Sequence, residues 1–319
     1  MRHAIKIVLL LASIWPLIVA EPAVAQLSGQ PKQTTNDAEN LAVVEGSVAW
    51  LTGDPEKAVA ILQPLAEKGN AEAQFSLGLI LTAGEGIPKD MKTALSLFHK
   101  AADQGNPKAQ TLLGLLYQEG KEVPQDYSAA ANWTRKAADQ GLADAQISLG
   151  RLYVLGQGVP KNYTEAALWY QRAADQGNSI GQFVVGMMYV EGKGLQRDYA
   201  LGANWLKKAA DQGNVDAQFF LGQLYFQGNG VLQDFVSAAN WWRQAADQGD
   251  PKAQYYLGRL YVGGNGVPRN FVEAHKWMNL SASNGNEEAL KGRNVLSSQM
   301  TPAQLAEAQR LAREWKKKE

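Results

Sequence analysis

Apolar and small residues recur along the chain in a pattern that repeats every 36 positions without an insertion. Within each unit, as in "AQISLGRLY" over residues 145–153, they fall at offsets 4, 8, 11 and 12 from a leading glycine. This spacing places them on one face of a helix, so it predicts an amphipathic first helix in every unit. A fixed period of this length is typical of a repeat architecture. The leading glycines are Gly69, Gly105, Gly141, Gly177, Gly213, Gly249 and Gly285.

A second helix is predicted after a loop such as "GQGVPKNY" over residues 156–163, because its glycines and proline end the first helix. An Asp or Asn follows each loop, where its side chain can accept hydrogen bonds from the free amides of the next helix. These capping residues are Asp90, Asp126, Asn162, Asp198, Asp234 and Asn270.

The second helix carries an apolar stripe with a recurrent tryptophan, which we interpret as core and not as a ligand cage. The tryptophans are Trp133, Trp169, Trp205, Trp241 and Trp277. The pentapeptide "AADQG" closes this helix five times. We interpret its alanines as the end of the buried stripe, its Asp and Gln as a solvated last turn, and its glycine as a left-handed stop.

A helix pair of this kind cannot bury its apolar face alone, so neighbouring pairs must stack. The predicted fold is therefore all-α, a right-handed α/α superhelical solenoid of stacked helix-turn-helix repeats. It comprises an N-terminal helix-pair cap over 37–69, six 36-residue repeats over 70–285 and C-terminal capping helices over 286–319. Residues 26–36 are polar and rich in Gln, Thr and Pro, which predicts a flexible linker.

The first 25 residues have the features of a signal peptide. A short basic start with Arg2 and Lys6 precedes an apolar stretch over 7–20, and small residues at 23–25 fit cleavage after Ala25. The apolar stretch is shorter than the roughly 20 residues of a membrane-spanning helix. We therefore expect a cleaved leader, no membrane span in the mature chain, and a periplasmic or secreted protein.

Composition narrows the classes of function. The chain has 31 basic and 31 acidic residues, so no net positive field favours a nucleic-acid partner. It has no cysteine, which excludes disulfides and thiolate chemistry. Of three histidines, His3 falls in the signal peptide, and His99 and His275 are interpreted as surface or hydrogen-bonded structural residues. Because no catalytic, metal or nucleotide motif is present, we expect no cofactor, no metal and no enzyme activity.

The candidate binding site lies on the side of the first helices that is turned away from the core. Offsets 3, 6, 10 and 13 point there, and in a stacked solenoid this side lines the concave surface. Offset 6 carries an apolar or aromatic residue in five of the six repeats. We predict a partner-binding face in the C-terminal half of the chain. Its residues are Ile147, Arg151, Phe183, Met187, Phe219, Phe226, Tyr255 and Arg259.

The same rings could instead pack between adjacent first helices, and the sequence leaves both possibilities open. An exposed row would suit an extended peptide or a partner helix. On that hypothesis, serine at both Phe219 and Tyr255 should weaken partner capture with little change in melting temperature. The alternative function is a cell-wall glycan or peptide binder, or an envelope enzyme, using the same face. The acids there, Glu72, Asp144 and Asp216, lie on separate repeats, which disfavours a glycosidase pair.

The pattern A-x-A-Q-x-x-L-G-x-L-Y-x-x-G-x-G-V-P-x-(D/N)-Y, followed by W and A-A-D-Q-G, resembles the Sel1-like repeat over residues 70–285. This family belongs to the tetratricopeptide-like α/α solenoids. The resemblance implies a non-enzymatic adaptor or regulator in the bacterial envelope that binds a protein partner, in signalling, envelope regulation or host interaction. We expect the protein to be a monomer.

Overall fold

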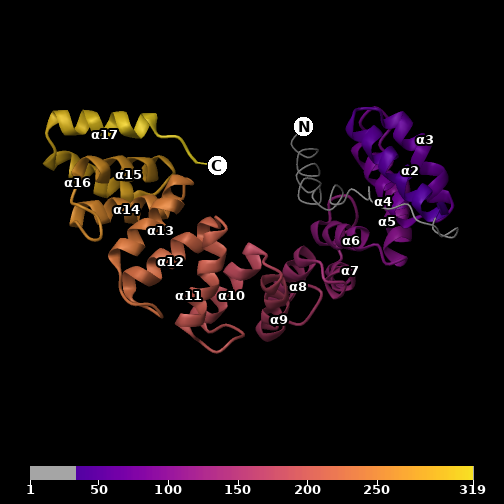
Figure 1. The fold of residues 1–319 in the computed structure, drawn as a ribbon, viewed down its shortest axis with the longest axis horizontal. Helices are drawn as coiled ribbons and strands as arrows, with labels where there is room; N and C mark the ends of the chain where they lie inside the picture. Colours follow the sequence, from indigo (N-terminus) through magenta and orange to yellow (C-terminus); the bar gives the residue numbers. More distant parts are fainter. Residues whose placement is uncertain (1–33, 319) are drawn as a thin grey trace. The chain divides into compact units, whose positions relative to one another are not determined.

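The computed structural model describes residues 34–318, which form sixteen α helices and no strand (Figure 1). The helices are α2 (Thr34–Leu51), α3 (Pro55–Glu67), α4 (Ala71–Ala83), α5 (Met91–Asp103), α6 (Pro107–Glu119), α7 (Tyr127–Asp139), α8 (Ala143–Leu155), α9 (Tyr163–Asp175), α10 (Ser179–Glu191), α11 (Tyr199–Asp211), α12 (Val215–Gln227), α13 (Phe235–Asp247), α14 (Pro251–Gly263), α15 (Phe271–Ser283), α16 (Glu287–Gln299) and α17 (Pro302–Glu314). The predicted all-α solenoid of helix pairs is confirmed. The predicted signal peptide, 1–25, lies outside the described residues.

The chain divides into two compact units, with the boundary inside α7. Unit 1 ends at Ala137 and unit 2 begins at Ala138. In unit 2, α8 pairs with α9, α10 with α11, α12 with α13 and α14 with α15. The second helices α9, α11 and α13 also pack against the first helix of the next pair. In unit 1, α2, α3, α4, α5 and α6 pack in the same consecutive way. The core of each unit therefore runs along the stack of helices.

Side-chain caps fix where the helices begin. The Asp234 carboxylate accepts a hydrogen bond of 2.9 Å from the Val236 amide, and equivalent bonds confirm all six predicted caps of the second helices. First helices are capped by Asn or Asp, except that Leu142 before α8 makes no side-chain cap. They end at left-handed glycines such as Gly228, with φ of 74°. Because these signals are local, the helix boundaries follow from the sequence alone.

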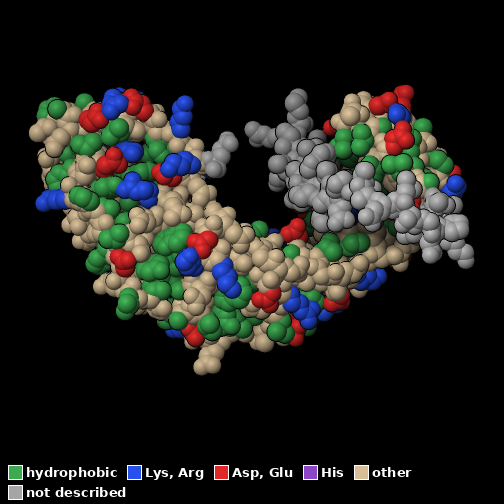
Figure 2. Space-filling model, in the orientation of Figure 1, with side chains coloured by type: hydrophobic (Ala, Val, Ile, Leu, Met, Phe, Trp, Pro, Cys, Tyr) green, Lys and Arg blue, Asp and Glu red, His purple; other side chains and the backbone are tan. Residues whose placement is uncertain are grey.

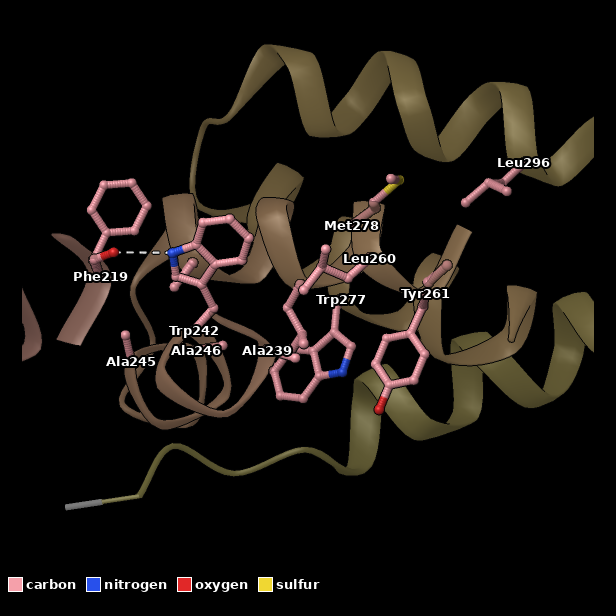
Figure 3. Packing of buried hydrophobic residues seen from close by; sticks show 13 residues of the cluster. Phe219, Ala239, Trp242, Ala245, Ala246, Leu260, Tyr261, Trp277, Met278 and Leu296 are labelled. Carbon is pink, nitrogen blue, oxygen red and sulfur yellow. Dashed lines mark hydrogen bonds between the residues drawn. The ribbon is translucent and has the colours of Figure 1, made fainter. Parts of the chain in front are cut away.

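Glycine on the first helix lets the second helix approach closely. A Cβ atom at Gly222 would lie 2.6 Å from Cδ1 of Trp242, closer than two carbon atoms can pack. The indole N–H of Trp242 donates a 3.0 Å hydrogen bond to the carbonyl of Phe219, which lies one turn before Gly222 on α12 (Figure 3). Trp242 is 1% exposed, so its ring and the missing side chain at position 222 are complementary.

The predicted burial of the recurrent tryptophans is found for three of the five. Trp133, Trp169 and Trp277 are buried, but Trp205 and Trp241 are half-buried. In the repeats of the last two, the following residue fills the core, since Leu206 and Trp242 are at most 1% exposed. The interpretation of the recurrent tryptophans as core therefore holds for three of the five and only in part for Trp205 and Trp241.

The glutamine of "AADQG" is not simply solvated, which corrects the interpretation from the sequence. In unit 2 its side-chain amide donates to a buried glutamine on the first helix of the same pair. The donor and acceptor pairs are Gln176 with Gln146, Gln212 with Gln182, and Gln248 with Gln218, at 2.7–2.9 Å. In unit 1, Gln104 bonds to Gln74 in the same way. These bonds join the end of the second helix to the first helix within each pair.

The two ends of the described chain differ from the repeats between them. Helix α2 begins at Thr34, so it includes the last three residues of the predicted linker 26–36. The polar start of α2 does not prevent a helix, because the linker's one proline, Pro31, lies upstream of Thr34. At the other end, α17 packs on α15, and the rings of Trp315 and Trp277 lie 6.5 Å apart.

None of the described helices has the length and apolarity needed to cross a membrane.

Candidate functional site

The predicted face falls within unit 2, on the first helices of four consecutive pairs. Helix α8 carries the half-buried Ile147 and the exposed Arg151. Helix α10 carries Phe183 and Met187, both half-buried. The remaining predicted residues lie on α12 (Phe219 and Phe226) and α14 (Tyr255 and Arg259). Ring-to-ring contacts link α10, α12 and α14.

The contacts form a continuous row of aromatic side chains, here called the aromatic row. From α10 to α14 its members are Phe183, Phe220, Phe219, Tyr256 and Tyr255. Successive ring centroids are separated by 6.0, 5.3, 5.9 and 5.4 Å. These separations are those of edge-to-face and tilted aromatic pairs, which stabilise one another beyond simple burial. The row therefore presents a fixed apolar surface across three helix pairs.

Two members of the row, Phe220 and Tyr256, were not predicted. Both stand at offset 7, one residue beyond the position that the sequence analysis singled out. Offset 7 points between the core side and the outward side of the helix, and both rings are half-buried. An aromatic residue at offset 7 in two successive repeats was the available signal.

Phe219 is mainly a core residue, which corrects its assignment to an exposed face. It is 8% exposed and belongs to the same buried cluster as Trp242 and Trp277 (Figure 3). Of the two possibilities left open by the sequence, packing between adjacent helices holds for Phe219. Tyr255, at the same offset, is half-buried and keeps part of its ring accessible.

Phe226 also faces the inside of its own helix pair. Its ring lies 5.3 Å from that of Phe235 and 5.4 Å from that of Trp242, both on α13. It is half-buried and supports the row only through Trp242, which stacks on Tyr256 at 4.9 Å. The expectation that Phe226 contacts a partner directly is not supported by this position, because α13 covers the ring.

Positive charge borders the aromatic row on α14. The guanidinium of the exposed Arg259 lies 5.7 Å from the Tyr255 ring and 5.9 Å from the Tyr256 ring. The ammonium of Lys252 lies 5.9 Å from the Phe219 ring. Cations at this distance are attracted to the ring faces. Apolar rings and basic groups thus occur together on this face, and Figure 2 shows apolar and charged side chains interspersed on the visible surface of unit 2.

A pocket adjoins the row between α10, α11 and α12. Its volume is about 240 Å³, and Met187, Val190, Tyr199, Phe220 and Gln223 are among its lining residues. The predicted Met187 therefore forms a wall of this pocket, together with the unpredicted Phe220. A flexible thioether beside an aromatic ring suits an apolar side chain of variable shape.

The acids considered for catalysis do not form a pair. Asp144 and Asp216 are exposed on different helix pairs of unit 2. In unit 1, Glu72 accepts from the ammonium of Lys108 at 2.7 Å and from the amide of Asn106 at 2.9 Å. Burial raises the pKa of Asp250, whose carboxylate caps α14. Among the described residues, no group of three His, Cys, Asp or Glu side chains could hold a metal ion.

Comparison with known proteins identifies the repeat. The family model described as Sel1 repeat matches residues 39–70, 71–106, 107–142, 143–178, 179–214, 215–250 and 251–286. The first match covers the shorter pair α2 and α3, so the model finds seven repeats where the sequence analysis counted six repeats and a cap.

Solved structures include similar chains. A Sel1 repeat protein from Oxalobacter formigenes is 32% identical, with a TM-score of 0.67 and coverage of 84% of this chain and 82% of that one. A protective antigen of uropathogenic Escherichia coli with an SLR fold is 26% identical, with a TM-score of 0.49 and coverage of 88% and 85%. No curated protein matches the chain. Since the family model matches far more than half of its residues, the chain belongs to the Sel1 repeat family.

Proposed function

We propose that the protein is a non-enzymatic adaptor that binds a peptide segment or a helix of a protein partner along the aromatic row of unit 2. Sel1 repeat solenoids commonly serve as protein-interaction scaffolds. The observation that carries the proposal for this chain is the row itself, five rings in contact across α10, α12 and α14. Four of these rings are half-buried, so they combine rigid positions with accessible apolar area.

The chemistry of the row indicates the kind of segment it would bind. Tyr255 and Tyr256 offer hydroxyl groups beside apolar ring faces, and Arg259 adds a cation at the edge. Aromatic and arginine side chains are the residues enriched at interaction hot spots. The pocket walled by Met187 and Phe220 would take an apolar side chain of the bound segment. We therefore expect an amphipathic peptide with apolar anchors and at least one acidic residue.

The experiment is site-specific photo-crosslinking in cells, with a photoreactive amino acid at position 255. The matched control carries the same group at Val236 on α13, which is 54% exposed and lies away from the row. We expect one protein to be captured from position 255 and not from position 236. Its crosslinked segment would then be tested as a purified peptide, and Tyr255→Ala should weaken its binding while Val236→Ala should not. Capture of glycan, or equal capture at both positions, would contradict the proposal.

We also propose that the mature protein acts in the bacterial envelope, in the periplasm or after secretion. The basis is the basic and apolar start of the chain with small residues before Gln26. Mass spectrometry of the protein from a periplasmic extract should find a mature N-terminus at Gln26. An intact Met1 on protein from the cytoplasmic fraction would contradict this location.

A further inference from the structure

A second pocket lies at the C-terminal end of unit 2, where α16 and α17 cover α15. Its volume is about 370 Å³. All of its lining side chains are polar and none is acidic. They include His275 and Asn279 of α15, Arg293 and Ser297 of α16, and Arg313 of α17. A pocket enclosed by three helices and lined only by polar groups is suited to a small polar ligand.

The two arginines give the pocket a positive charge that no carboxylate neutralises. Arg293 donates 2.9 Å and 3.1 Å hydrogen bonds to the neutral amide oxygens of Asn279 and Asn294. Neither Arg293 nor Arg313 forms a salt bridge within residues 34–318. By contrast Arg310, one turn from Arg313 on α17, pairs with both Glu307 and Glu314. Arginines that line one polar pocket and have no carboxylate partner favour an anionic ligand.

His275 adds an unsatisfied polar atom at the same place. The ring is 2% exposed, and its Nε2 lies 3.0 Å from the hydroxyl of Ser297. That hydroxyl donates to the Arg293 carbonyl at 2.9 Å, so Nε2 is the donor to the serine oxygen. The other ring nitrogen, Nδ1, is buried and has no hydrogen-bond partner in the described part of the chain. With the proton on Nε2, Nδ1 is an acceptor, and a buried acceptor without a partner is unfavourable. The hydroxyl of a protonated phosphate, or a water bound with the anion, could donate to Nδ1 and relieve this cost.

The charge of the pocket at neutral pH comes from the arginines alone. Burial and the neighbouring Arg293 hold the pKa of His275 below its usual value, so the ring is neutral at pH 7. Guanidinium groups remain protonated at any physiological pH, and their planar donors match two oxygens of one carboxylate or phosphate group. The attraction for an anion is therefore permanent.

We infer that the pocket between α15, α16 and α17 binds a small oxyanion, a phosphate or carboxylate group, held by Arg293 and Arg313. The inference is independent of the aromatic row, because no residue is shared between the two sites. An anion bound there would also tie α17 to α15 and α16.

The test is calorimetric titration of the full chain at constant ionic strength with inorganic phosphate, with malonate, and with choline chloride as a cationic control. We expect heat of binding with at least one of the two anions and none with choline; the anion preferred decides between phosphate and carboxylate. Arg313→Gln should weaken binding about tenfold or more, since a charge-assisted hydrogen bond is lost. Arg310→Gln on the same helix should leave it unchanged.

Proton NMR locates the binding in the pocket. During the titration the ring resonances of His275 should shift, while those of His99, which lies in unit 1, should not. Arg313 is exposed at the surface, so the variant should keep the helical content and the ligand-free melting temperature of the parent. No heat with either anion, or equal weakening by Arg310→Gln and Arg313→Gln, would overturn the inference.

Discussion

Gln212 and Gln182 are joined by a hydrogen bond of 2.7 Å between their side-chain amides, which links the end of α11 to α10 within one helix pair. Gln182 is buried and its own side-chain amide donates to the carbonyl of Ala174 at the end of α9, the second helix of the preceding pair. Gln212 also donates to the carbonyl of Gly177 at 3.0 Å. Gln182 thus joins α10 to the end of the preceding pair, and Gln212 joins the end of α11 to Gln182 within its own pair. The invariance of "AADQG" has a structural cause in this bond.

Loss of the buried glutamine should destabilise unit 2 more than loss of the exposed one. Gln182→Leu removes two hydrogen bonds, from the Gln182 amide to the Ala174 carbonyl and from the Gln212 amide to the Gln182 oxygen, so we expect a loss of about 1–3 kcal/mol in the free energy of unfolding. Gln212→Ala should cost about 0.5–1.5 kcal/mol. Urea denaturation followed by circular dichroism measures both. In the control Gln171→Ala, which removes an exposed bond to Asp175, stability should hardly change.

Local signals made most of the fold predictable. The sequence predicted the helix pairs from their 36-residue repeat. It predicted their boundaries because an Asp or Asn cap and a left-handed glycine each act on backbone groups only a few residues away. The Gln212–Gln182 bond could not be predicted in this way, because its partners are 30 positions apart and meet only when the two helices of the pair pack together. Tertiary packing decides such contacts, and helical periodicity does not specify them.

The candidate face shows the same limit. Phe219 and Tyr255 share offset 6, yet the first is buried and the second half-buried. The first helix of the next repeat decides the difference. Helix α14 brings Tyr256 against Phe219. In the repeat after Tyr255, α16 has Gly292 at the position that corresponds to Tyr256, so no ring is available to cover Tyr255. Exposure on this face therefore depends on the neighbouring repeat as well as on the helical angle.

Phe219 and Tyr255 should respond differently to truncation, which replaces the expectation that both could be changed without loss of stability. Phe219→Ala empties a buried site beside Trp242 and should cost about 3–5 kcal/mol. Tyr255→Ala removes a half-buried ring and should cost less than half as much. Thermal and urea unfolding measure the two variants. Equal losses would show that Tyr255 is as much part of the core as Phe219 and would remove it from the proposed binding face.

Gly222→Ala should destabilise unit 2 although alanine is the better helix former. The new methyl group would lie 2.6 Å from Cδ1 and 2.7 Å from Nε1 of Trp242, and the hydrogen bond to Phe219 holds that ring in place. Overpacking costs about 1–3 kcal/mol, which exceeds the helix-propensity gain of about 1 kcal/mol when the ring cannot move. Urea unfolding should show the loss, and the tryptophan emission should shift.

The matched control for this substitution is Gly263→Ala in the last turn of α14. Its nearest neighbour would be the amide of Asn265 at 3.2 Å, the end of an exposed and flexible side chain. We expect Gly263→Ala to be neutral or slightly stabilising. If both alanines proved neutral, the close approach of α12 and α13 at Gly222 would not constrain the sequence.

Stability should fall as the solution is acidified through the titration range of His275. Its folded-state pKa lies below the unfolded value of about 6.5, because the ring is buried and Arg293 is close. The unfolded chain therefore binds the proton more readily, and the slope of unfolding free energy against pH is positive there. The stability that the neutral His275 ring contributes is fully present above its unfolded-state pKa. It is lost as the pH drops from about 7 toward the lower folded-state pKa.

The comparison that isolates this effect is the difference in unfolding free energy between the parent and His275→Gln, measured from pH 7.5 to 5. Carboxylates titrate in both proteins and cancel in the difference. We expect the parent to lose stability relative to the variant as the pH falls, because glutamine cannot take up a proton. Phosphate bound beside Arg293 and Arg313 would supply a negative charge that favours the imidazolium and raises the folded-state pKa of His275, so saturating phosphate should make the parent's loss of stability relative to the variant smaller. A difference curve that stays flat over this range would show that His275 titrates alike in the folded and unfolded chains.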